Sequence, residues 1–288
     1  MLDQQSRLQQ TQLQLSTGKK LLTPSDDPAA AARSIELNQG IMQTEQYQGN
    51  INAARQRIAL EDGVLQNAVD ALHRIKELGI QGLNDTNSPS DRIIIATEME
   101  TLNEHLVSLA NTRNANGEYL FSGFKSTTQP FSKNTAGGYT YSGDANQRTL
   151  QIAENRQIAD GDPGVNVFGT PANSLPAAGA NGNIFEAIAR FAADLRSNSP
   201  DPASLDDVSS ALDKMLTVEA SVGVRLNALD SQESVNADAV LNMKTVLSAT
   251  EDLDYAEAIS KYNLQTVSLQ AAQQAFTQVK KLSLFNYL

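Results

Sequence analysis

Apolar residues recur at alternating steps of three and four along two long stretches of the chain, the spacing that puts them on one face of an α-helix. The first stretch carries Ile51, Ala54, Ile58, Glu61, Leu65, Ala68, Leu72, Ile75 and Gly79. The second carries Leu226, Leu229, Glu233, Asn236, Val240, Met243, Leu247 and Thr250. Both are heptad patterns and predict long helices that pair as a coiled coil. Glu61 breaks the first pattern, and the polar members of the second fix register while weakening the packing.

Capping residues predict where the first helices begin. Asp27 precedes Pro28, so a helix is expected to start at Pro28 and to run to about residue 86, on the order of 90 Å long. Ser88, with Asp91 three residues later, forms a capping box for a second helix that ends near residue 114. The apolar positions of this second helix are Ile95, Met99, Leu102, Leu106 and Leu109. The short connection between the two helices makes them antiparallel neighbours.

Two further helix starts follow a region rich in Gly, Asn and Pro. Asn183 with Glu186 is expected to cap a helix that carries Ile184, Ile188, Phe191 and Leu195, and Asp201 before Pro202 caps the next. Short β-prone pieces lie between the helical halves of the chain, at residues 139–141, 149–152 and 165–168. They predict a small β-rich insertion.

This order of elements predicts a mainly α fold. We expect an elongated antiparallel coiled-coil or helical-bundle rod built from the N- and C-terminal segments, with a β-rich inserted domain. The expected parts are residues 1–22 with 253–288 as terminal helices, residues 23–124 with 183–252 as the rod, and residues 125–182 as the outer domain. Such a hairpin arrangement brings the two termini to the same end of the rod.

The chain ends have apolar stripes that require a partner. Free ends normally fray and are polar, so an apolar end is expected to dock against another helix. The candidate assembly residues on the N-terminal segment are Leu8, Leu15 and Leu22. Those on the C-terminal segment are Tyr255, Ile259, Tyr262, Leu264, Val267, Leu269, Phe276, Leu282, Leu284, Phe285 and Leu288.

Composition and motifs exclude several classes of function. The net charge of −11 argues against binding to nucleic acid, which needs clustered Lys and Arg. With no cysteine, disulfides and thiolate metal sites are impossible. There is no stretch of about 20 apolar residues for membrane insertion and no signal-peptide pattern. His73 and His105 are expected to be solvated surface residues, and we predict no catalytic residue, metal site or cofactor site, and hence no enzyme.

Several motifs resemble those of one known family. Leu15-Ser-Thr-Gly18, the run from Leu22 through Asp26-Asp27 to Ala31, and Ser248-Ala-Thr-Glu-Asp252-Leu-Asp254-Tyr-Ala256 resemble the two terminal signatures of bacterial flagellins and their hook-associated relatives. Asn116-Gly-Glu-Tyr-Leu-Phe-Ser-Gly123, Tyr141-Ser-Gly-Asp144 with Arg148, and Leu282-Ser-Leu-Phe-Asn-Tyr-Leu288 are similar to the hook-associated protein 3 branch of that superfamily.

The resemblance implies a structural, non-catalytic function at the junction of the flagellar hook and filament. It implies export through the flagellar type III channel without signal cleavage, an extracellular location, and a ring of subunits whose terminal helices form the inner wall of the tube. The implied partners are hook-associated protein 1, flagellin, other copies of the chain and, before secretion, a flagellar export chaperone. Family members usually begin with a further amphipathic stretch, so the N-terminus is expected to be shortened or trimmed.

Three alternatives remain open from the sequence. A short flagellin would share the terminal signatures, but it would not usually end as this chain does. A helical surface adhesin or receptor-binding module would recognise a defined target as a monomer. A glycan-active enzyme on a flagellar scaffold would need a pair of carboxylates facing a cleft in the insertion.

Overall fold

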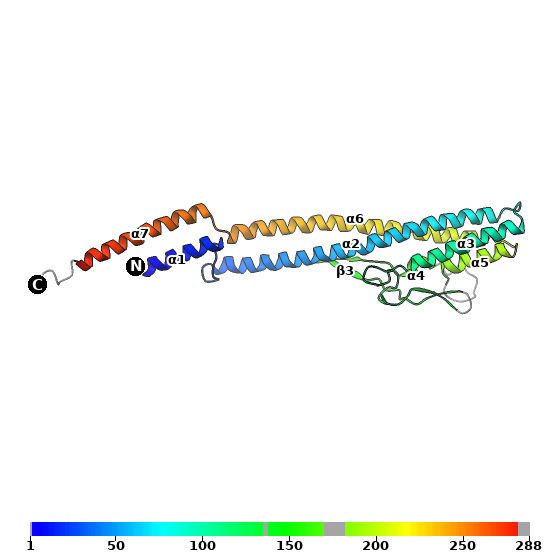
Figure 1. The fold of residues 1–288 in the computed structure, drawn as a ribbon, viewed down its shortest axis with the longest axis horizontal. Coiled ribbons are helices and arrows are strands. Elements are labelled where there is room, and N and C mark those ends of the chain that lie inside the picture. The colour runs from blue at the N-terminus through cyan, green and yellow to red at the C-terminus, as the bar shows by residue number, and fades with distance from the viewer. Residues whose placement is uncertain (1, 135–137, 170–181, 282–288) are drawn as a thin grey trace. The chain divides into compact units, whose positions relative to one another are not determined.

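The computed structural model describes residues 2–134, 138–169 and 182–281, and in these residues the fold is mainly α, as predicted (Figure 1). The long helices are α1 Leu2–Thr17, α2 Pro28–Gly82, α3 Pro89–Ala110, α5 Ile184–Arg196, α6 Pro202–Glu251 and α7 Tyr255–Lys281. The chain forms two compact units. Unit 1 holds residues 1–46 with 236–288, and unit 2 holds residues 47–235.

The heptad positions of α2 form the spine of the unit 2 core. All of the predicted positions from Ile51 to Gly79 are buried, including Glu61. The predicted stripe of α6 contributes Leu229, which is fully buried. Arg55 of α2 pairs with Asp230 and Glu233 of α6. The coiled-coil pairing of these two helices in unit 2 is therefore confirmed.

The predicted caps of unit 2 are present. Ser88 and Asp91 form a complete capping box at the start of α3. The side chain of Asn183 accepts a hydrogen bond from Glu186 N at the start of α5. An ion pair between Arg74 and Glu98 joins α2 to α3, and α3 packs side by side with α5 (Figure 1). The helix predicted to reach residue 86 ends at Gly82.

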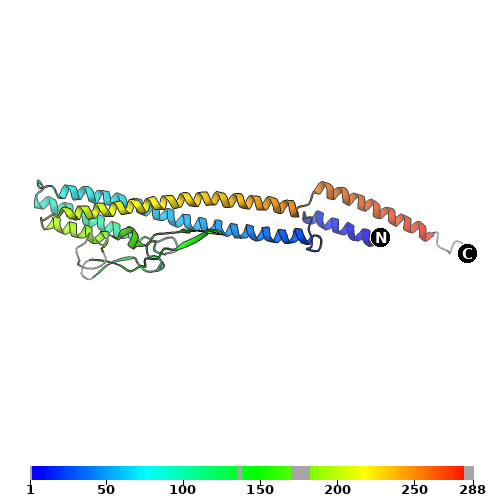
Figure 2. The same cartoon turned by 180° about the vertical axis from the view of Figure 1, so that it is seen from behind.

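Two β-hairpins lie between α3 and α5 in the chain (Figure 2). Strand β1 Phe131–Lys133 pairs antiparallel with β2 Tyr139–Tyr141, and β3 Thr149–Ala153 pairs antiparallel with β4 Arg156–Ala159. The strands predicted at 139–141 and 149–152 are confirmed, whereas β1 and β4 were not predicted. Asn50 of α2 donates to Gln151 O, which holds the second hairpin against the helices of unit 2.

The strand predicted at residues 165–168 is wrong, because this segment forms the short helix α4 Gly164–Phe168. Its Val and Phe residues favour strands, but burial decides the conformation here. The helical turn puts Phe168 against Phe121, Phe131 and Phe185, with ring centroids 5.1, 5.6 and 5.5 Å away. An aromatic cluster thus joins the hairpin region and α5 into one core.

Unit 1 buries far fewer side chains. Ile41 and Ala258 are its buried apolar residues among those that the structure describes. The first part of α2 faces the last part of α6, where Lys244 pairs with Glu45 at 2.9 Å and Met243 lies so close to Gly40 that a Cβ there would meet its sulfur at 2.9 Å. The helices of unit 1 are therefore held by close backbone approach and ion pairs more than by apolar burial.

Candidate functional site: the terminal helix pair

Helices α1 and α7 pack against each other at the terminal end of unit 1, running in opposite directions (Figure 1). The side chains between them are mostly small or polar. Thr11 and Ala258 are buried, and Tyr262 and Leu269 are half-buried on the same face of α7. Open spaces remain along this interface, including one of about 320 Å³ lined by Arg7, Gln10, Thr11, Gln14, Lys261 and Gln265. The pair is consequently loosely packed.

The two helices meet at a joint formed by the chain after α1 and the chain before α7. Lys20 N donates to Glu251 O at 2.6 Å, and Leu253 N donates to Gly18 O at 3.0 Å. Gly18 has a φ of +69°, a conformation that favours glycine, and a Cβ there would lie 2.8 Å from Tyr255 Oη. These contacts explain why glycine follows Leu15-Ser-Thr and why Tyr255 lies in the C-terminal motif.

Glu251 is the central carboxylate of the joint. It accepts hydrogen bonds from Lys19 Nζ and from Ser34 Oγ of α2, and its side chain is 13% exposed. The Lys19 ammonium, together with the Ser34 hydroxyl, lowers the pKa of Glu251. One side chain thus ties the end of α6 to the start of α2 and to the turn after α1.

The acidic residues of the two terminal motifs act as caps. Asp27 Oδ1 accepts from Ala29 N and Ala30 N at the start of α2, as predicted. Asp26 Oδ2 accepts from Leu22 N and Thr23 N and closes the preceding turn, and these backbone hydrogen bonds lower the pKa of Asp26. Asp254 caps α7 through Ala256 N and Glu257 N. The carboxylates are used to shape the joint.

The candidate assembly residues divide into two groups in the structure. Those half-buried in unit 1 are Leu8, Leu15, Leu22, Tyr262 and Leu269. Those exposed are Tyr255, Ile259, Leu264, Val267 and Phe276, and the most exposed are Leu264 at 70% and Val267 at 63%. The interface with α1 does not cover Leu264 or Val267, so α7 has apolar side chains on two faces. Leu282, Leu284, Phe285 and Leu288 lie outside the described residues.

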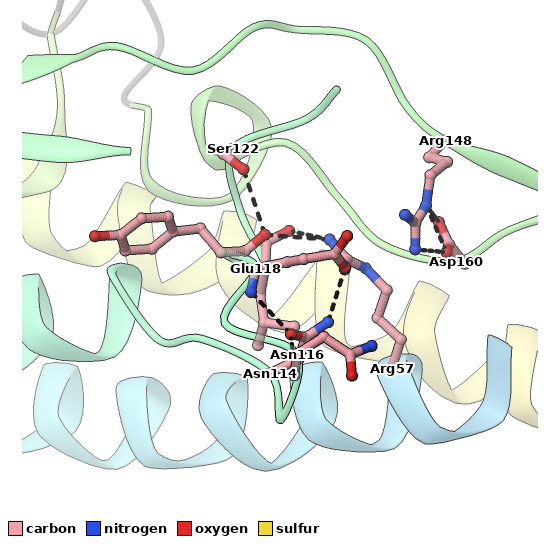
Figure 3. Close-up of polar contacts among 9 residues, drawn as sticks. Arg57, Asn114, Asn116, Glu118, Ser122, Arg148 and Asp160 are labelled. Atoms are coloured by element: carbon pink, nitrogen blue, oxygen red, sulfur yellow. Dashed lines mark hydrogen bonds and ion pairs between the residues drawn. The ribbon is translucent and has the colours of Figure 1, made fainter. Parts of the chain in front are cut away.

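The internal motifs build a polar network in unit 2 instead of an exposed site (Figure 3). Asn114 donates to Glu118 Oε2 at 2.9 Å, and Arg57 of α2 contacts the same carboxylate. Arg148 pairs with Asp160, whose side chain is 1% exposed. Gly123, at φ +65°, leaves room for Asp144, since a Cβ there would lie 2.7 Å from Asp144 O. The network fastens the hairpins to α2.

The polar residues that join the helices within each unit were not predicted from the sequence. Glu251 and Ser34 lack a periodic signal, although Glu251 belongs to the motif that carried the resemblance. Glu61 was noticed only as a break in the heptads, yet its Oε1 accepts from Asp162 N, and Asp162 pairs with Arg225 of α6. Burial, with the nearby Asp162 carboxylate, raises the pKa of Glu61 to about 8. The sequence signal that could have identified Glu61 as a buried polar residue was its charge at a heptad position.

His73 and His105 are exposed, as predicted. Within the described ranges, none of the helices has an apolar stretch long enough to span a lipid bilayer.

Comparison with known proteins places the chain in the class of flagellin-type structural proteins. Residues 1–126 match the model of the bacterial flagellin N-terminal helical region. The flagellar hook-associated protein 3 of Escherichia coli K12 is 33% identical, over 94% of this chain and 90% of that protein, and its Salmonella typhimurium counterpart is 32% identical over the same shares. A crystal structure of the flagellar junction protein FlgL from Legionella pneumophila, 26% identical, covers 78% of this chain and 100% of that one with a TM-score of 0.65.

The chain therefore belongs to the flagellar hook-associated protein 3 family, a family of structural components of the flagellum.

Proposed function

We propose that this protein is a structural adaptor at the junction between the flagellar hook and the filament, and that it catalyses no reaction. The family relationship supports the location, since relatives are named hook-associated and junction proteins. The observation that carries the mechanism is the surface of α7, where Leu264 and Val267 lie exposed on the side that α1 leaves uncovered. Two exposed aliphatic side chains one helical turn apart suit a neighbouring helix.

The partners we propose follow from this surface. In the flagellum, residues 1–22 with 253–288 act as the assembly domain and contact equivalent helices of other copies, hook-associated protein 1 on one side and flagellin on the other. Before assembly the same face of α7 is covered by a flagellar export chaperone, because an exposed apolar helix face in a free monomer favours aggregation. The protein is secreted to the extracellular flagellum without cleavage of a signal peptide.

The double substitution Leu264→Asp with Val267→Asp tests this proposal. Charges on this face oppose burial against another helix, so we expect the variant to abolish filament attachment and swimming motility in a strain that depends on it. Circular dichroism of the purified variant should stay unchanged, because both side chains are exposed in the monomer.

A charge-matched control is Asn263→Asp with Ser268→Asp, since both positions are exposed on α7 and neither is apolar. The control should support motility. Detection of each variant in the culture medium separates a failure of assembly from a failure of export. Normal motility of the Leu264→Asp, Val267→Asp strain would contradict the assignment of this face.

A further inference from the structure

Two buried polar atoms in unit 2 face the same small space. Arg57 and Glu61 lie one turn apart on α2, with exposed fractions of 8% and 1%. Among the residues that the structure describes, neither Arg57 Nε nor Glu61 Oε2 has a hydrogen-bond partner. The remaining groups of both side chains are occupied: the Arg57 Nη atoms contact Glu118, Tyr119 O and Leu120 O, and Glu61 Oε1 accepts from Asp162 N. Leaving such deeply buried polar atoms without a hydrogen-bond partner destabilises the folded state.

Gly161 marks the space between them. A Cβ built on Gly161 would have as its nearest neighbours Arg57 Nε at 3.3 Å, Glu61 Oε2 at 3.8 Å and Leu120 O at 3.8 Å. All three neighbours are polar, one being an N–H donor and two being oxygen acceptors. Arg57, Leu120 and Gly161 also line a cavity of about 10 Å³, together with Asp162, whose backbone N–H donates to Glu61 Oε1. This volume is close to the smallest that holds one water molecule.

We propose that Arg57, Glu61, Leu120 and Gly161 form a binding site for a single structural water. When Glu61 is ionised, the water accepts a hydrogen bond from Arg57 Nε–H and donates its two protons to Glu61 Oε2 and Leu120 O. The water thus accepts one hydrogen bond and donates two, which matches the one N–H donor and the two oxygen acceptors around it. If Glu61 is protonated at Oε2, the direction of that hydrogen bond reverses and the water keeps all three partners.

The site has a structural consequence for the hairpin region. Leu120 belongs to the motif of residues 116–123, and Gly161 follows Asp160, the partner of Arg148. A water at this point joins α2 to both segments. A side chain at position 161 would compete with the water for this volume, because its Cβ would lie among the same three polar atoms.

The first measurements are made on the wild-type protein. In a nitrogen-15 NMR spectrum the side-chain Nε–H of Arg57 should show a cross-relaxation signal to water of the sign given by a long-lived bound molecule. A high-resolution crystal structure should show a density peak within roughly 2.6–3.2 Å of both Arg57 Nε and Glu61 Oε2. A missing signal together with an empty site would overturn the proposal. Anomalous scattering at the peak in crystals grown with bromide or rubidium would also overturn it, because the occupant would then be an ion.

Gly161→Ala tests the same site by filling it. We expect loss of the water signal at Arg57 and a fall in melting temperature of about 2–8 °C. Gly63→Ala is the matched control, because a Cβ at Gly63 meets nothing within 4 Å. The control should keep the water signal and melt at the same or a higher temperature, since alanine favours the helix. A water signal that persists unchanged in Gly161→Ala would contradict the site.

Discussion

Glu61 occupies a position in α2 where the heptad pattern places an apolar side chain. Burial, with the Asp162 carboxylate nearby, raises the pKa of Glu61 to about 8, against an ordinary value of 4.5. Arg225 opposes this shift, but less strongly. In the range between these two values the folded state holds a proton that the unfolded chain releases. Stability from Glu61 is thus fully present below about pH 4.5 and is lost as pH rises toward 8.

We predict that Glu61→Gln removes this pH dependence. We expect the free energy of unfolding of Glu61→Gln, taken relative to that of the wild type, to increase between pH 5 and pH 8. The increase should be on the order of 1–3 kcal/mol. Urea unfolding at several pH values measures it. Asp70→Asn, at an exposed position of the same helix, is the control. Its free energy of unfolding should change with pH in the same way as that of the wild type. A constant difference between Glu61→Gln and the wild type across this range would contradict the predicted titration.

Among the helices, the joint between the terminal pair and the long pair depends on the carboxylate of Glu251. Glu251 connects the end of α6 to the turn after α1 and to α2, through Lys19 and Ser34. Its pKa is lowered by these partners, so its contribution is present above its ordinary pKa of 4.5 and is lost as pH falls through the lowered value. The joint should therefore loosen in acid. Burial of Glu61, by contrast, stabilises the folded state more in acid than at neutral pH.

Substitution of Glu251 by Ala should increase local opening of the turn after α1. Trypsin cleaves after Lys19 and Lys20, and cleavage within a folded protein follows the population of locally opened states. We expect several-fold faster cleavage at these lysines in Glu251→Ala than in the wild type. Glu257→Ala, at an exposed position in the first turn of α7, should be cleaved at the wild-type rate. Equal rates in all three proteins would show that Glu251 does not hold the joint.

Elements with a strong local signal could be predicted from the sequence. The heptads of α2 and α6 and the caps at Ser88 and Asn183 were correct because periodicity and capping are local properties. Helix α4 was missed because contacts with distant phenylalanines set its conformation. The polar joint at Glu251 was missed for the same reason, since Ser34 lies 217 residues away in the chain.

At the scale of the whole molecule, the two units differ in what stabilises them. Unit 2 has a large apolar core with an aromatic cluster, while unit 1 relies on caps, ion pairs and a polar helix interface. Apolar burial stabilises by roughly 25 cal/mol per Å² of surface removed from water, so unit 1 gains less from folding alone. This difference suits a unit that we propose completes its packing on assembly.

Hydrogen exchange of the free monomer should separate the two units. We predict that amides of α1 and α7 exchange faster than those of α3 and α5, because local opening costs least where few side chains are buried. Mass spectrometry of peptides from each helix measures the rates. Protection of α7 equal to that of α3 would mean that the terminal pair is stable without a partner.

The proposed junction role is tested most directly in a strain that lacks this gene. Electron microscopy of that strain, with an assay for flagellin in the culture medium, is the measurement. We predict hooks without filaments and flagellin released into the medium, with both defects reversed by the wild-type gene. Intact filaments on the deletion strain would contradict the junction role.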